Sequence, residues 1–409
     1  MTTFRASWVL PITGPPIRNG WVSVVDGVVT AVGPPGTSGT PGTPATTATD
    51  LGAVAVLPAL VNAHTHLELS YLAGAVAPTA RFLDWIRAVM AARRGHPDPR
   101  DPEIVGAARA AIAAARASGT GVVGDISNTL VTVPLLREAR MAARVFYELL
   151  GFNADDPAGR VQEARAALDA HGQDGGVRLS LAPHAPYSVS PALFAALRGD
   201  LDGHPADVST VHLSESPDEV ELIARGGGGW RDLLVELGVW PSAWRPPGGS
   251  PVAYLADLGF LDARVLAVHA VQCGGDDLAR LRTLGSTVVS CPRSNRHVGV
   301  GDPPLETFFA AGVPVAFGTD SLASVADLNM FAELAAARRL APRVPARHLL
   351  ESATLQGARA LGFASELGTI EPGKRAALVA VRLPEGVGDV EEYLLSGIEP
   401  GAVTWLDTP

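Results

Sequence analysis

The chain has 409 residues, of which 47% are hydrophobic and 18% charged, and its formal net charge is −10. A chain this apolar can bury a large core, which argues against disorder, and the acidic balance argues against a nucleic-acid surface, which needs clustered lysine and arginine. No stretch is long and apolar enough to span a bilayer. Prolines interrupt the apolar run in the opening residues, MTTFRASWVLPITGPP, so no signal peptide is expected. We therefore expect a cytoplasmic globular protein without nucleic-acid or membrane partners.

The first fifty residues are predicted to form a small β unit. Residues 21–33, WVSVVDGVVTAVG, contain two short β-rich runs around Asp26-Gly27, which is a strong hairpin signal. Residues 34–50 are rich in Pro, Gly and Thr. This composition is typical of an exposed, mobile loop.

The next apolar run, residues 54–61, predicts a buried strand that leads into residues 62–70, NAHTHLELS. Side chains alternate faces along a strand, so His64 and His66 are expected to point the same way, and Glu68 to continue that face. Two adjacent imidazoles are poor core material because their nitrogens need polar partners, but they are good metal ligands. The pair alone is weak evidence, and further ligands must come from other parts of the chain.

Strand and helix patterns alternate through the central part of the chain. Helical stretches such as IVGAARAAIAAARASG, residues 104–119, separate most of the apolar β-rich runs. Eight such strands with helices between them predict a (β/α)8 TIM barrel. A doubly wound open sheet is the alternative, but no Gly-rich nucleotide fingerprint follows the first strand. The predicted strands cover residues 57–63, 121–126, 143–148, 177–182, 208–213, 265–269, 286–290 and 313–318.

The C-terminal segment 367–384, LGTIEPGKRAALVAVRLP, again predicts short strands, here around a Pro-Gly turn. Neither end of the chain can bury a face alone, so we expect the two ends to pair. The predicted domains are a composite β-sandwich of residues 1–55 with 368–409 and a barrel of residues 56–367.

Polar residues recur where the predicted strands end, and this is where barrels of this type place their catalytic groups. Neutral imidazoles with a carboxylate suit Zn²⁺, which lowers the pKa of a bound water from about 15.7 to about 7. Glu215 lies in a loop three residues beyond His212, where it could reach substrate rather than metal. The single lysine, Lys374, is far from these ends, so no lysine can bridge two metals and a single metal is expected. The residues at this rim are His64, His66, His184, His212, Glu215, His269 and Asp320.

The motifs NAHTHLELS, HAPYS, HLSES, VHAVQC, CPRSN and GTDSLAS, in this order, resemble those of the amidohydrolase superfamily. More narrowly, they are similar to its adenosine-type deaminase and chlorohydrolase branch. The flanking segments NGWVSVVDGVVTAVG and LGTIEPGKRAALVAV are similar to the split β-sandwich of that family, so the resemblance covers nearly the whole chain. One departure is Ala377, which stands where the family usually has an acidic residue in the sandwich.

The resemblance implies one divalent metal, Zn²⁺ with Fe²⁺ or Mn²⁺ as alternatives, and a hydrolytic deaminase of a 6-aminopurine nucleoside. In this reaction zinc hydroxide attacks the amino-bearing ring carbon and ammonia leaves. Glu215 would protonate the adjacent ring nitrogen, His269 and Asp320 would handle the hydroxide proton, and His184 would contact the substrate. A chlorohydrolase or cyclic-amide hydrolase could use the same residues, whereas a non-catalytic scaffold should lack them. The implied metal ligands are His64, His66, His212 and Asp320.

Weaker similarities concern the substrate. FLDWIR (82–87) and SNRHVGVG (294–301) are similar to 6-aminodeoxyfutalosine deaminases of menaquinone biosynthesis, to which S-adenosylhomocysteine deaminases are closely related. Both substrates are nucleosides with an anionic extension, and an arginine near the mouth would suit a carboxylate. Arg296 is the predicted partner, with Arg293 second.

Three further features leave alternatives open. Trp85 either stacks on the substrate or packs within its helix, and Glu68 either contacts the substrate or supports His66. Residues 226–251 carry three of the seven tryptophans between glycine and proline clusters, and they either cover the site or pack on a neighbouring subunit. A small-molecule substrate is the expected partner, and a homodimer is expected from the resemblance alone.

Overall fold

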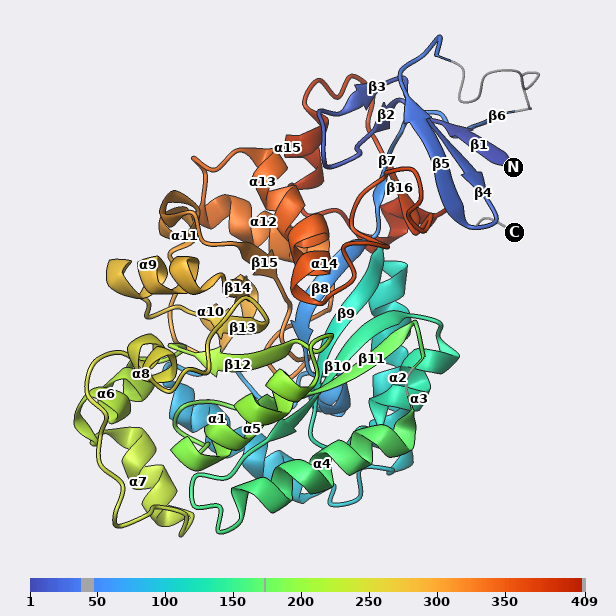
Figure 1. Cartoon of the computed structure of the whole chain (residues 1–409). Coiled ribbons are helices and arrows are strands. Elements are labelled where there is room, and N and C mark those ends of the chain that lie inside the picture. The colour runs from blue at the N-terminus through green and yellow to red at the C-terminus, as the bar shows by residue number, and fades with distance from the viewer. Residues whose placement is uncertain (38–47, 173, 407–409) are drawn as a thin grey trace.

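The structure, a computed structural model, describes residues 1–37, 48–172 and 174–406 and has an α/β centre of parallel strands flanked by helices (Figure 1). Eight strands form two four-stranded parallel sheets, in the orders β11-β10-β9-β8 and β12-β13-β14-β15, which confirms the predicted alternation. The strands are β8 (Leu60–Thr65), β9 (Thr120–Ser127), β10 (Ala142–Leu149), β11 (Val177–Pro183), β12 (Ser209–Leu213), β13 (Val265–His269), β14 (Thr287–Ser290) and β15 (Val315–Phe317).

Five of the helices begin with the same local signal, an Asp or Ser followed by proline. The side chains of Asp101, Asp156, Ser190, Ser216 and Ser250 each accept a hydrogen bond from a backbone N–H of the first turn. Proline suits the next position because its missing N–H would have no helical partner there. The helices are α1 (Phe82–Arg94), α2 (Pro102–Ala117), α3 (Thr132–Glu138), α4 (Pro157–His171), α5 (Pro191–Gly203), α6 (Pro217–Arg225), α7 (Gly229–Glu236), α8 (Pro251–Asp257), α9 (Gly275–Leu284), α10 (Pro292–His297), α11 (Leu305–Ala311), α12 (Met330–Leu340), α13 (Ala346–Glu351), α14 (Gly357–Ala360) and α15 (Val390–Leu394).

The parallel strands are buried on both faces. On β9, Val122 and Val123 belong to two different hydrophobic clusters, and on β13 the same holds for Ala267 and Val268. Successive strand residues point to opposite faces, so each face of these strands packs against its own set of apolar side chains. Because both faces are buried, the strands appear in the sequence as continuous apolar runs and not as alternating ones.

The two parallel sheets contact each other at both edges. Between β11 and β12, the His212 backbone N–H donates to the His184 carbonyl (2.9 Å). Between β8 and the end of β15, the Asp320 N–H donates to the His64 carbonyl (3.0 Å). Gly318 makes the second contact possible, because a Cβ there would lie 2.7 Å from the His64 carbonyl oxygen.

Gly318→Ala is therefore expected to destabilise the fold by about 1–3 kcal/mol, the usual effect of forcing an extra carbon against packed backbone. Gly106→Ala is the matched control, since a Cβ at Gly106 in α2 meets nothing within 4 Å. This control should stabilise the protein by about 0.5–1 kcal/mol. Urea unfolding of both variants measures the difference, and equal stabilities would show that the backbone can shift to accept the methyl group.

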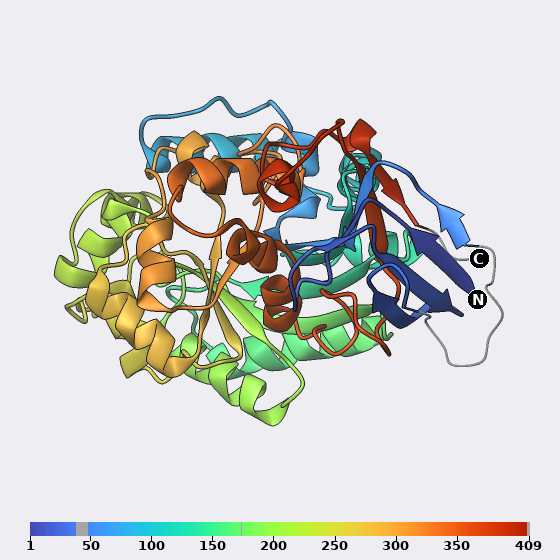
Figure 2. The same ribbon diagram turned by 90° about the horizontal axis from the view of Figure 1, so that it is seen from above.

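The two ends of the chain contribute two further sheets, in the orders β5-β4-β1-β6 and β17-β16-β7-β2-β3. Figures 1 and 2 show the N- and C-terminal strands side by side at one end of the molecule. A hydrophobic cluster that includes Phe4, Val22, Val56 and Leu378 joins residues of both sheets. The strands are β1 (Thr2–Arg5), β2 (Trp8–Val9), β3 (Ile17–Arg18), β4 (Trp21–Val25), β5 (Val28–Gly33), β6 (Ala48–Asp50), β7 (Val54–Pro58), β16 (Leu378–Arg382) and β17 (Val403–Trp405).

Two details of this region differ from the prediction. The apolar run 54–61 is not one strand: β7 pairs antiparallel with β16 of the terminal sheet, and β8 begins the central sheet after Pro58 and Ala59. Proline lacks the N–H that a continuous ladder needs, which favours a break at this point. In the predicted loop 34–50, residues 38–47 lie outside the described part, and β6 pairs parallel with β1 instead of forming loop.

The predicted hairpin at Asp26-Gly27 is confirmed. β4 and β5 pair antiparallel, and both turn residues have positive φ (49° and 73°), as a two-residue type I′ turn requires. In the described part of the chain, no helix has both the length and the apolar character needed to cross a membrane.

Candidate active site

The four predicted metal ligands lie together at the carboxyl ends of the parallel strands or just beyond them. The ring centroid of His64, on β8, lies 4.9 Å from that of His66 and 5.0 Å from that of His212 on β12. Asp320 follows β15, and its Oδ1 lies 3.4 Å from His66 Nε2 and 3.8 Å from His64 Nε2. The structure thus brings side chains from three distant segments to one point.

The backbone around this point is held in unusual conformations. Ser214, His269 and Asp320 have φ values of 52°, 73° and 62°, in the left-handed region that non-glycine residues rarely adopt. Such residues cost about 1–3 kcal/mol each and persist where the surroundings hold them, often at functional sites. For Asp320, the Ser321 N–H and the Ser294 hydroxyl hold the carboxylate by donating to Oδ1 and Oδ2 (2.8 and 2.5 Å).

The five histidines of the site are neutral at pH 7. Burial is the main cause that lowers the pKa of His66 to about 3 and the pKa values of His184 and His212 to about 4. Neighbouring imidazoles act in the same direction on His66 and His212, and the Arg93 guanidinium does so on His66 and His184. Burial, followed by the adjacent histidines, also holds the pKa values of His64 and His269 well below the usual value. A neutral imidazole offers a nitrogen lone pair, which is the form that binds metals.

The chemistry of these residues fits a divalent metal ion. Both ring nitrogens of His64 are buried without a hydrogen-bond partner in the described residues, and each such orphan costs about 1–3 kcal/mol unless something satisfies it. Potential ligand atoms of His64, His66 and Asp320 lie within 4.8 Å of one another, and so do those of His64, His212 and His269. Several imidazoles with one carboxylate are typical ligands of zinc and of other first-row metals.

Glu215 and His269 form a pair beside this cluster. Glu215 is buried, and its Oε1 lies 3.5 Å from His269 Nε2. Burial, then the nearby carboxylates of Asp320 and Glu219, raise the pKa of Glu215 well above its usual value. Glu219 holds the Glu215 loop, because its two carboxylate oxygens accept the backbone N–H groups of Ser214 and Glu215 (2.8 and 2.9 Å). A buried carboxyl with a raised pKa keeps its proton to a higher pH than an ordinary glutamate and is suited to donate that proton.

The floor of a cavity of about 960 Å³ is lined by His66, His212, Glu215, His269 and Asp320. Its polar floor includes His184, whose Nδ1 is hydrogen-bonded to the Ser188 hydroxyl (2.6 Å). Its walls are mainly apolar: Trp85 lines the cavity and anchors its indole N–H on the Ala323 carbonyl (3.3 Å). The cavity therefore offers polar chemistry at its floor and apolar contact above it.

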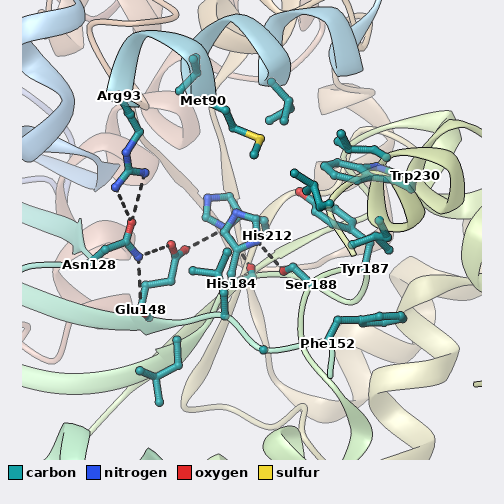
Figure 3. A pocket seen from close by; sticks show the side chains of 18 of the residues that line it. Met90, Arg93, Asn128, Glu148, Phe152, His184, Tyr187, Ser188, His212 and Trp230 are labelled. Atoms are coloured by element: carbon teal, nitrogen blue, oxygen red, sulfur yellow. Dashed lines mark hydrogen bonds and ion pairs between the residues drawn. The ribbon is translucent and has the colours of Figure 1, made fainter. Parts of the chain in front are cut away.

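Part of the segment 226–251 covers this cavity. Trp230 on α7 lines it and stacks on Tyr187 with a centroid distance of 3.8 Å, as the close view in Figure 3 shows. Leu233, Leu234 and Leu237 line it as well. These contacts support the covering role over the subunit-contact alternative. Leu237, which follows α7, remains 44% exposed.

The structure does not bring the two predicted arginines to the cavity. Arg296 is exposed and paired with Asp302 (2.9 Å), and Arg293 is paired with Glu333 and Asp327. Both belong to α10, whose turn directs their side chains to acidic residues on neighbouring segments. The arginines that line the cavity are instead Arg93 and Arg94 on α1 and Arg160 on α4.

Glu68 also differs from its prediction. β8 ends at Thr65 and residues 67–72 form a 3-10 helix, so the strand alternation stops before Glu68. Its carboxylate accepts hydrogen bonds from the Ser127 and Thr129 hydroxyls (2.8 and 2.7 Å) and lies outside the cavity lining. Glu68 therefore stabilises the loop after β9. It neither contacts the cavity nor supports His66.

Glu148 is a buried polar group that was not predicted from the sequence. Glu148 lies at the end of β10 and lines the cavity, and its carboxylate accepts a hydrogen bond from the Asn128 amide (2.9 Å). Figure 3 shows Arg93, Asn128, Glu148 and His212 in a row. The available signal was a single acidic residue in the apolar run ARVFYELL, at the end of the predicted third strand.

Comparison with known proteins places these features in context. A model described as the amidohydrolase family matches residues 55–400. The chain is 36% identical to an aminodeoxyfutalosine deaminase of Deinococcus radiodurans (76% of this chain, 74% of that one). It is 32% identical to a 5-methylthioadenosine/S-adenosylhomocysteine deaminase of Moorella thermoacetica (91% and 83%). The crystal structure of an adenosine deaminase from Xanthomonas campestris with bound zinc is 29% identical and superposes with a TM-score of 0.83 (98% and 90%).

Proposed function

Because this chain belongs to the amidohydrolase family, we propose that its cavity binds a 6-aminopurine nucleoside with an anionic extension and removes the amino group by hydrolysis. A hydrolytic deaminase acting on C–N bonds agrees with the deaminase relatives. The observation that carries the proposal is the Glu215–His269 pair, which lies beside the histidine and aspartate cluster at the cavity floor.

The residues that would hold the metal are His64, His66, His212 and Asp320. Zinc is the proposed ion, supported by the orphaned nitrogens of His64 and by the zinc in the Xanthomonas structure. When bound, such an ion would lower the pKa of a water at the cavity floor to about 7, which makes this water a nucleophile at neutral pH.

The proton transfers belong to residues of this chain. Water adds to the amino-bearing ring carbon while Glu215 gives its proton to the adjacent ring nitrogen, which would otherwise gain negative charge. His269 and Asp320 take the proton that the water loses. The bond from carbon to the exocyclic nitrogen then breaks, and the amine leaves as ammonia with a proton from these groups. As the carbonyl forms, the proton of the added hydroxyl returns to Glu215. The catalytic groups thus end as they began, and the products have gained one proton on the ring nitrogen and one in ammonia.

The distal part of the cavity suits an anionic, aromatic extension. Among the described lining residues the carboxylates are Glu148, Glu215 and Asp320, all buried at the floor, whereas Arg93, Arg94 and Arg160 lie toward the exposed side. An amino-acid extension such as that of S-adenosylhomocysteine would bring an ammonium group. The side of the cavity that carries the three arginines has no acidic residue among its described lining residues to pair with it. Aminodeoxyfutalosine, whose extension ends in an aryl carboxylate, is therefore the favoured substrate, in keeping with a place in menaquinone biosynthesis.

The experiment that tests the proposed function is ammonia release by zinc-loaded protein. The panel holds aminodeoxyfutalosine, S-adenosylhomocysteine, 5-methylthioadenosine, adenosine, guanine and cytosine. Fast turnover of one adenine nucleoside is the expected result. No release from any of them by the metal-loaded protein would contradict the proposal and favour a chlorohydrolase or cyclic-amide hydrolase.

Arg160→Ala should raise KM for aminodeoxyfutalosine about tenfold, equivalent to about 1.4 kcal/mol, with little change in kcat. The backbone N–H of Arg160 donates to the Asp156 carbonyl, but its guanidinium has no hydrogen bond or ion pair with another described residue, so its charge is available to a ligand. KM for adenosine, which lacks the anion, should not change. Arg296→Ala is the control, because Arg296 is paired with Asp302 outside the cavity. Equal losses on both substrates would show that Arg160 shapes the cavity rather than binding the anion.

The same proposal extends to the architecture. The contacts at both edges of the two parallel sheets support one closed (β/α)8 barrel, residues 56–367. The shared hydrophobic cluster of the terminal sheets supports a composite β-sandwich of residues 1–55 with 368–409. The carboxyl ends of the barrel strands would then surround the active site.

A further inference from the structure

Glu148 is a buried carboxylate at the cavity floor that the proposed reaction does not use. Only 6% of the residue is exposed, and its Oε1 lies 3.5 Å from His212 Nδ1. Its Oε2 accepts a hydrogen bond from the side-chain amide of Asn128 (2.9 Å), and the Arg93 guanidinium donates to Oδ1 of the same side chain (3.4 Å). A buried carboxylate is costly unless its surroundings compensate for the charge, so this arrangement calls for an explanation.

The His212 ring has a defined orientation. Its Nδ1 lies 2.9 Å from the His184 carbonyl oxygen, which can only accept, so Nδ1 carries the hydrogen. Nε2 therefore keeps the lone pair. Glu148 lies on the same side of the ring as this N–H, where its negative charge favours the Nδ1–H tautomer and increases the electron density at Nε2.

We propose that Glu148 is a positioning residue for the metal site: together with the His184 carbonyl it fixes His212 so that Nε2 faces the ion. Asn128 holds Glu148 in turn, and Arg93 holds Asn128. The inference rests on the proposed metal site, in which His212 is a ligand. Carboxylates that support a metal-binding histidine typically contribute 10- to 100-fold to metal affinity.

Glu148→Gln tests this role directly. Glutamine keeps the size of the side chain. Its amide oxygen is expected to accept the hydrogen bond from Asn128, so its NH₂ group faces the Nδ1–H of His212. Two donors then face each other, and the support of the His212 ring is lost. We expect the affinity for Zn²⁺ to fall about 10- to 100-fold in competition with a chelator. The absorption spectrum of the Co²⁺-loaded variant should also change. The melting temperature of the metal-free variant should stay near that of the metal-free parent.

The matched control is Glu333→Gln, which removes another buried, ion-paired carboxylate, one whose partner is Arg293 rather than a site histidine. Its metal affinity and Co²⁺ spectrum should equal those of the parent. If Glu148→Gln does not fold, Asn128→Ala carries the test, because it removes the donor that holds Glu148 and should weaken metal binding in the same direction.

The outcomes separate the two proposals. A parent protein that binds no stoichiometric metal would overturn the metal site and this inference with it. A parent that binds metal, beside a folded Glu148→Gln variant with equal affinity and an unchanged Co²⁺ spectrum, would overturn the role of Glu148 alone. Where Asn128→Ala carries the test, unchanged affinity has the same meaning.

Discussion

Glu215→Gln should lower kcat for deamination about 10²- to 10⁴-fold, the usual contribution of a positioned proton donor. Glutamine has nearly the shape of glutamate but no proton to give to a ring nitrogen, so the loss should fall on kcat rather than on substrate binding. Steady-state ammonia release by the zinc-loaded variant measures it. Metal content is measured on the same sample, because Glu215 is not among the proposed ligands and the variant should retain its ion.

The pH dependence of the same variant gives a second readout. Burial and the neighbouring carboxylates raise the pKa of Glu215, so its proton persists to a higher pH than in an ordinary glutamate. As proton donation needs the protonated carboxyl, kcat of the parent should fall when the pH rises through this pKa. That alkaline limb should be missing from the residual activity of Glu215→Gln. A variant that keeps most of kcat, or the same limb, would exclude Glu215 as the donor.

Removing the metal should abolish deamination and lower thermal stability, and Zn²⁺ should restore both. An ion that binds only the folded state at 1,000 times its Kd contributes about 4.1 kcal/mol to stability. Without the metal, both buried ring nitrogens of His64 also lack a hydrogen-bond partner among the described residues. Dialysis against a chelator, followed by metal analysis, activity and melting curves, measures the effect.

Two histidine variants test whether this metal binds at the proposed site. His64→Asn should retain little metal and show no activity, whereas His348→Ala, which changes a histidine outside the site on α13, should match the parent in both. Full activity in chelated protein with less than stoichiometric metal would contradict the proposed chemistry. Metal retained by His64→Asn at parental affinity would instead move the site away from His64.

Much of the site could be predicted because its residues stand at the carboxyl ends of apolar strands or just beyond them. His212 and His269 lie at the ends of such runs, and Glu215 and Asp320 follow them within a few residues. Parallel strands bring their carboxyl ends to one side. Their placement at the same edge therefore followed from the order of the strands, whereas the distances between them did not. The roles assigned to them stay predictions until the variants above are measured.

The arginines could not be predicted in this way. Arg93 and Arg160 lie on helices α1 and α4, and neither stands near a strand end in the sequence. Whether a helical side chain faces the cavity depends on how its helix packs. Arg296 stands within a family-like motif, yet Asp302 six residues later pairs with it and holds it outside the cavity lining.

The sequence by itself determined the α/β class, the strand–helix order and the polar residues at the strand ends, because these depend on local periodicity and on short-range signals such as Asp26-Gly27. Only the tertiary structure decided that the run 54–61 divides between two sheets and that Glu68 supports a loop. The same holds for the place of Glu148 beside His212. These facts depend on contacts between segments far apart in the chain, and no local pattern encodes the distance between two such side chains.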